Sequence, residues 1–101
     1  MEAIESVFFA TGNAIPDAVP SQMFGKKSFK IANKAFVAFF QDCMVFKLSG
    51  DDHAQAMSLS GAKLFDPSGK GRPMKEWVQI PHEHVASWAK YASAATDYVA
   101  A

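Results

Sequence analysis

The chain has 101 residues, ten of them basic and ten acidic, and its formal net charge is zero. Half of the residues are hydrophobic and 13% are aromatic, which is enough apolar surface for a buried core and excludes a disordered chain. The length fits one domain over residues 1–101, and the zero net charge argues against a strong overall attraction to nucleic acid or to an anionic membrane.

The compartment follows from the cysteine content and the N-terminal residues. A single cysteine, Cys43, cannot form an internal disulfide, which favours a reducing compartment. Glu2 and Glu5 lie where a signal peptide would be basic. No apolar run approaches the roughly 20 residues of a membrane-spanning helix. We therefore expect a cytoplasmic protein without membrane contact.

The first predicted element is a helix. Ile4, Val7 and Phe8 follow one another at helical spacing and predict a helix over residues 2–11. Two prolines within residues 13–20 break any regular pattern and predict a loop.

The next segment changes to the pattern of strands. Residues 28–48 alternate and are rich in Phe and Val. Asn33-Lys34 and Gln41-Asp42 interrupt this pattern, and Asn tolerates the left-handed conformation that tight hairpin turns require. The segment therefore predicts three antiparallel strands, at residues 29–31, 36–40 and 43–48.

The second half of the chain predicts two more helices and two more strands. Gly50-Asp51-Asp52 fits the start of a helix that runs to about residue 60. Strands are predicted at residues 63–65 and 74–80. One apolar stripe predicts an amphipathic final helix, formed by Val85, Trp88, Ala92, Ala95 and Val99. The predicted fold is a two-layer α+β arrangement in the order α-β-β-β-α-β-β-α, with an antiparallel sheet and helices mainly on one side.

Five short motifs follow one another along the chain in an order that is typical of one family. They are Met23-Phe24-Gly25, Lys34-Ala35-Phe36, Phe46-Lys47-Leu48, Phe65-Asp66-Pro67 and the run Met74-Lys75-Glu76-Trp77-Val78-Gln79-Ile80-Pro81. This series resembles the TfoX N-terminal domain family and the YjbR-like proteins over about residues 20–100. The resemblance implies a fold of the secretion-chaperone-like type.

The chain departs from that family in two respects. Many members carry Gly before the lysine of the first hairpin turn, where this chain has Asn33. The competence regulator that gives the family its name has a second domain, so a role that depends on that domain is not carried over. Many members have no assigned activity.

No residue pattern predicts a catalytic or cofactor site. The strongest candidate metal ligands are His82 and His84, with His53 as a third. Side chains two positions apart point to different sides of a helix, which makes this pair a poor metal site. Cys43 has no basic sequence neighbour to lower its pKa, so we expect an inert thiol. We therefore predict a protein that is not an enzyme and that holds neither a metal nor a cofactor.

Positive charge concentrates in two segments. The first hairpin and the later loop carry the lysines and the arginine that we consider as anion or nucleic-acid contacts, namely Lys26, Lys27, Lys30, Lys34, Lys70 and Arg72. One interpretation is that solvated lysines protect an outer strand from pairing with another chain. The other is a set of phosphate contacts, which predicts weak, sequence-tolerant and salt-dependent binding of nucleic acid.

The last candidate site is the sheet face opposite the helices. Strict alternation predicts that Val37, Phe39, Val45 and Trp77 share this face, beside Lys47, Lys75 and Gln79. An exposed apolar patch of this kind is typical of an interface, unless the loop at residues 13–20 or a helix covers it. The leading hypothesis is therefore a protein-interaction or regulatory module, or a homodimer, that uses this face. Nucleic-acid binding is the alternative.

Overall fold

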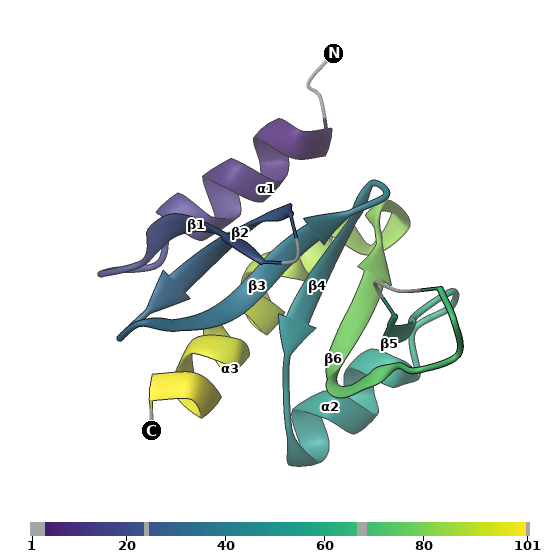
Figure 1. Ribbon diagram of the computed structural model, residues 1–101. Helices are drawn as coiled ribbons and strands as arrows, with labels where there is room; N and C mark the ends of the chain where they lie inside the picture. Colours follow the sequence, from purple (N-terminus) through teal and green to yellow (C-terminus); the bar gives the residue numbers. More distant parts are fainter. Residues whose placement is uncertain (1–3, 24, 67–68, 101) are drawn as a thin grey trace.

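The computed structural model describes residues 4–23, 25–66 and 69–100 (Figure 1). Phe24, Pro67 and Ser68, which belong to the motifs and the basic loop named above, lie outside the described residues. The elements are α1 (Ile4–Asn13), β1 (Val19–Met23), β2 (Lys26–Ile31), β3 (Lys34–Phe40), β4 (Cys43–Lys47), α2 (Gly50–Met57), β5 (Lys63–Phe65), β6 (Met74–Pro81), the 3₁₀ helix η1 (His82–Ser87) and α3 (Trp88–Ala100).

All strands join one antiparallel sheet with the order β1-β2-β3-β4-β6-β5. The α+β class and the antiparallel sheet are confirmed. The prediction of a loop up to residue 20 is wrong at its end, because Val19 begins strand β1, which pairs with β2. This strand lies at the sheet edge and contains Pro20, so neither its composition nor its alternation separates it from a loop.

Two tight turns set the register of the central strands. Ala32 and Asn33 have φ of 51° and 65°, and Gln41 and Asp42 have φ of 49° and 62°. Two successive residues at positive φ give a two-residue hairpin loop whose twist matches that of the flanking strands. The second turn lies where it was predicted, whereas the first is one residue earlier, so that Lys34 already belongs to β3.

The helices pack on one face of the sheet, which we call the covered face. In Figure 1, α3 lies behind the strands, α1 lies next to β1 and β2, and α2 lies beside β6. Phe8 of α1 is fully buried and its ring centroid lies 5.3 Å from that of Phe29 and 5.4 Å from that of Phe39. Large buried side chains fill this layer: Phe8, Phe29, Phe36, Met44, Phe46, Ile80, Trp88 and Tyr91.

Helix α1 approaches β2 so closely that only a glycine fits between them. A Cβ atom placed on Gly12 would lie 2.2 Å from the Cε2 atom of Phe29. The absence of a side chain at this position therefore sets the distance between the helix and the sheet.

The chain segment after β6 forms a 3₁₀ helix before the last α-helix begins. The residues of η1, from His82 to Ser87, precede Trp88, the first residue of α3. Trp88 is fully buried, as its place in the predicted apolar stripe requires. The final helix is thus α-helical from Trp88 onward, three residues later than the start of the predicted stripe at Val85.

Candidate functional site

The second face of the sheet carries an apolar cluster made of strand residues. Ala38, Val45, Phe65 and Trp77 are its buried members, and Met23, Ala35, Phe40 and Met74 pack around them. All eight lie on strands, so we call this side the helix-free face.

The prediction that four residues share this face is wrong for two of them. Val37 and Phe39 pack in the core beneath the helices, whereas Val45 and Trp77 lie in the cluster of the helix-free face. Strand register is the cause, because Phe39 is the partner of Met44 and cross-strand partners share a face. The register could have been derived from the two-residue turn at Gln41-Asp42. This turn makes Phe40 and Cys43 partners, so the next pair is Phe39 and Met44.

A β-bulge adds a second departure from strict alternation. Phe29 is the partner of Val37 and Lys30 is the partner of Ala35, so that Phe36 has no partner on β2. One extra residue moves the following side chains to the opposite face. Phe36 and Val37 therefore both enter the covered core.

The apolar cluster of the helix-free face is buried within the chain itself. Val45 is 0% exposed and Trp77 is 7% exposed. Among the described residues, the exposed large apolar side chains are Val19 at 54% and Tyr98 at 38%, and neither belongs to this cluster. The helix-free face thus lacks the open apolar patch that the alternation predicted.

Lysines surround this cluster. Lys26 and Lys30 of β2 are the cross-strand partners of Met23 and Ala35, Lys47 of β4 is the partner of Trp77, and Lys63 of β5 is the partner of Gln79. The ammonium nitrogen of Lys26 lies 5.1 Å from the ring centroid of Phe40, the range of a cation–π contact. None of the described strand positions that register places on this face is Asp or Glu.

The predicted basic residues divide between the two faces. Lys27 forms an ion pair with Glu5 of α1 and lies 5.7 Å from the ring centroid of Phe9, so it belongs to the covered side. Lys34 lines a small hollow of about 200 Å³ with Lys47, Tyr98 and Val99. Lys70 and Arg72 are exposed in the loop before β6. Register thus places Lys26, Lys30 and Lys63 on the helix-free face, together with Lys47, which alternation had already assigned to it. Lys27 belongs to the covered side.

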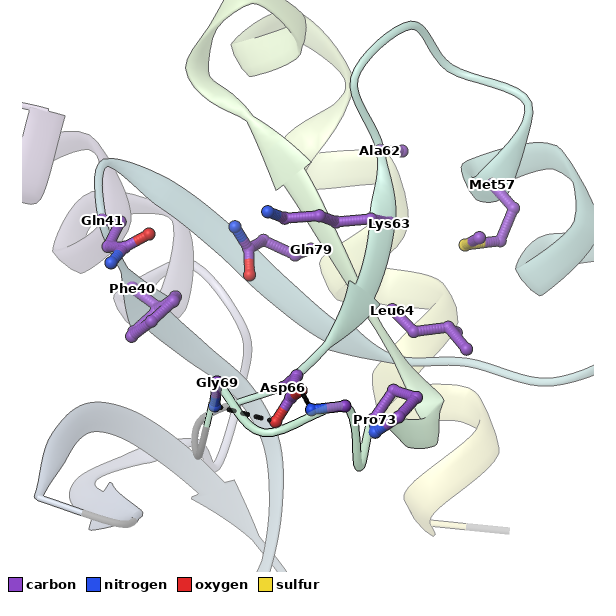
Figure 2. Close-up of a pocket in the computed structure, with 11 residues that line it drawn as sticks. Phe40, Gln41, Met57, Ala62, Lys63, Leu64, Asp66, Gly69, Pro73 and Gln79 are labelled. Carbon is purple, nitrogen blue, oxygen red and sulfur yellow. Dashed lines mark hydrogen bonds between the residues drawn. The ribbon is translucent and has the colours of Figure 1, made fainter.

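A cavity of about 590 Å³ opens at the outer edge of β5 (Figure 2). On the helix-free side it is lined by Phe40, Gln41, Lys63 and Gln79. On the other side of β5 the lining is largely apolar and comes from Met57, Ala62, Leu64 and Pro73. The size lies within the range of roughly 300–1,000 Å³ that is typical of small-molecule sites.

The loop that closes this cavity is held by one carboxylate. Asp66 accepts hydrogen bonds from the backbone N–H groups of Gly69, Gly71 and Arg72, at 3.1, 2.9 and 3.2 Å. Figure 2 shows the contact between Asp66 and Gly69. Hydrogen bonds to a charged acceptor are stronger than neutral ones, so Asp66 holds residues 69–72 close to the end of β5.

Cys43 lies next to the buried amide of Gln79. The Nε2 atom of Gln79 lies 3.6 Å from the Cys43 sulfur and donates a hydrogen bond to it. Burial raises the pKa of the Cys43 thiol, while the hydrogen bond from Gln79 and the charge of Lys63 act in the opposite direction. A raised pKa lowers the thiolate fraction and with it the reactivity of the thiol.

Two of the three candidate histidines, His53 and His84, bond to the backbone, and the ring of His82 packs against Trp88. The Nε2 atoms of His53 and His84 lie 2.8 Å from the carbonyl oxygens of Lys75 and Ser60, respectively. Within the described ranges, no group of three or more His, Cys, Asp or Glu residues is placed to hold a metal ion.

Comparisons with protein-family models, with curated protein sequences and with solved structures find no match for this chain. In the part of the chain that the structure describes, no helix is both long enough and apolar enough to cross a membrane.

Proposed function

We propose that this protein is a nucleic-acid-binding domain that uses the helix-free face of its sheet. One observation carries the proposal: Lys26, Lys30, Lys47 and Lys63 register on this face, and the described strand positions of the face hold no carboxylate. The chain as a whole is neutral, so the positive charge of this face is balanced by acidic residues elsewhere in the molecule. Lysines neutralise phosphates without reading bases, so the binding is weak and sequence-tolerant.

The competing hypothesis of a protein-interaction or regulatory module, or of a homodimer, receives less support. It depended on an open apolar patch, but Val37, Val45 and Trp77 are buried and Phe39 packs, partly buried, against the covered core. The resemblance to the TfoX N-terminal domain and YjbR-like families, which covers most of the chain, remains a prediction from sequence motifs.

The test is a titration of labelled oligonucleotides at about 50 and about 200 mM salt, where counterion release separates phosphate contacts from other binding. For a single strand, each phosphate contact contributes about 0.7 to the slope of log affinity against log salt, so four lysines give a slope of roughly −3. Failure to bind either a single strand or a duplex at the lower salt overturns the proposal.

Two double variants with the same net charge test which face of the sheet binds the oligonucleotide. Lys26→Gln with Lys30→Gln removes two cations from the helix-free face and should reduce the slope by about 1.4. Lys27→Gln with Lys90→Gln removes two cations on the helix side and should leave the slope unchanged. Equal effects of the two pairs would show that only overall charge matters and that the helix-free face is not the site.

A further inference from the structure

The cavity beside β5 combines a cation, an aromatic ring and a buried amide on the side of the helix-free face. Lys63 and Gln79 are direct cross-strand partners and their side chains leave the sheet on the same side. Phe40 and Gln41 form the neighbouring wall, at the turn between β3 and β4. In Figure 2 these four side chains surround one open space beside β5.

Gln79 is the unusual member of this set. Its side chain is 5% exposed, and a buried amide is expected to satisfy its hydrogen-bonding groups. The Nε2 atom bonds to the Cys43 sulfur, but no described residue hydrogen-bonds to Oε1. Figure 2 shows this oxygen directed toward the space between Phe40 and Asp66. An acceptor that opens into a cavity is a ready partner for a hydrogen-bond donor on a ligand.

The charge in and around the cavity favours an anionic ligand. Lys63 lines it, and the ammonium nitrogen of Lys26 lies 5.1 Å from the centroid of the Phe40 ring, which forms one wall. The one carboxylate in the lining belongs to Asp66, and three backbone N–H groups of its own loop donate to it. These amides offset its charge, so it repels an approaching phosphate less than a free carboxylate would.

These features together fit a nucleotide unit. An amide presents a donor and an acceptor side by side, which matches the edge of a base, adenine in particular. Aromatic rings provide stacking surfaces for unpaired bases, and lysine supplies a counter-charge for the phosphate. Bases in a duplex are stacked and paired, so their edges cannot enter a lateral cavity without being flipped out.

We infer that the cavity beside β5 receives one unpaired base of the bound strand, with Gln79 bonded to the base edge, Phe40 against its ring and Lys63 at its phosphate. This inference rests on the proposed function, and it specifies that the bound nucleic acid is single-stranded.

The first test compares oligonucleotide binding by two matched variants. Gln79→Met keeps the length of the side chain but removes both hydrogen-bonding groups, and Gln22→Met makes the same change on the exposed edge strand β1. We expect Gln79→Met to weaken binding of a single-stranded adenine oligonucleotide about fivefold, the effect of losing one hydrogen bond. Gln22→Met should leave it unchanged. Thermal melts of both variants verify that they fold.

The second test uses Cys43 as a reporter, because its sulfur lies 3.6 Å from the Gln79 amide. We expect adenosine monophosphate to slow alkylation of Cys43 by iodoacetamide, and inorganic phosphate at the same concentration to have much less effect. A base in the cavity engages Gln79 and shields the thiol, whereas phosphate alone occupies the lysines.

The outcomes separate the inference from the proposed function. One outcome is that oligonucleotides bind with the expected salt dependence, but Gln79→Met binds as well as the wild type and the nucleotide does not protect Cys43. The cavity is then not a base site, and only the proposed binding by the lysines of the helix-free face is retained. If single strands bind no more tightly than duplexes of the same length, the inference is also overturned. If no oligonucleotide binds at low salt, both fail.

Discussion

The two faces of the sheet differ in how much apolar surface they bury and in how their charged side chains are arranged. On the covered face, aromatic rings from α1, β2 and β3 pack against one another. Two charged side chains at its margin have partners: Lys27 pairs with Glu5, and Glu76 accepts a hydrogen bond from Tyr98. On the helix-free face, a small cluster closes on itself and is surrounded by lysines without carboxylates on the strands. The covered face thus contributes most of the buried aromatic surface, and the excess positive charge of the other face is the feature on which the proposed function depends.

The largest expected contrast between the faces is in the stability of two phenylalanine variants. Phe8→Ala removes a fully buried ring that contacts three other rings and should lower the free energy of unfolding by about 3–5 kcal/mol. Phe40→Ala removes a half-buried ring of the helix-free face and should cost less than half of that. Urea denaturation of both variants measures the difference. Equal losses would contradict a division into a stabilising face and a binding face.

The close approach of α1 to β2 gives the next largest effect. Gly12→Ala places a Cβ atom 2.2 Å from the Phe29 ring and should cost about 1–3 kcal/mol through overpacking. Helix propensity alone predicts the opposite sign, since Ala is favoured over Gly by about 1 kcal/mol within a helix. Ser6→Ala, on the exposed side of α1, is the control and should change little. A stabilised Gly12→Ala variant would show that α1 packs less tightly on the covered face.

On the helix-free face, the loop after β5 depends on Asp66. Asp66→Ala removes the acceptor of three backbone hydrogen bonds and should lower stability by about 1–2 kcal/mol. Amide exchange should accelerate at Gly69, Gly71 and Arg72. Asp97→Ala removes the same charge from an exposed position near the end of α3, where a carboxylate is unfavourable, and should not destabilise. Unchanged exchange at the three amides would mean that the loop is held by other contacts.

The smallest effect is the titration of the Cys43 thiol. Because burial raises its pKa, alkylation should increase with pH through a midpoint above that of an ordinary cysteine. Lys63→Gln should raise this pKa further, since the lysine charge stabilises the thiolate, whereas Lys90→Gln on α3 should not. The folded pKa exceeds the unfolded one, so this group stabilises the fold fully below the unfolded pKa and loses that effect as pH rises through the folded pKa. A midpoint that does not respond to Lys63→Gln would place the lysine away from the thiol.

The sequence predicted most of the elements and less of their arrangement. The helices at both ends, the central hairpins and the strand before Pro81 follow from periodicity and turn residues. Strand β1 was missed because its five residues, Val19 to Met23, include a proline and show no apolar alternation. An edge strand of this kind forms because it pairs with β2. That pairing cannot be predicted from the residues of the strand itself.

The candidate site was predicted less well, for a related reason. Strict alternation assigned Val37 and Phe39 to the same face as Val45, but register and the bulge at Phe36 place them on opposite faces. The basic residues were identified by type, whereas their separation depended on which strand positions face the helices. Alternation assigned Gln79 to the correct face, but nothing in the sequence marked it as a site residue, because a glutamine becomes informative only when it is buried beside a cavity.

What the sequence by itself determined is therefore local: the period of each segment, the positive-φ turns at Asn33 and Asp42, and the amount of apolar surface to be buried. These depend on residues within a few positions of one another. The tertiary structure decided which face each side chain occupies, which lysines gather on the helix-free face, and where a buried amide meets a cavity. These properties depend on strand pairing between distant residues, in which a shift of one position reverses the facing of every side chain that follows.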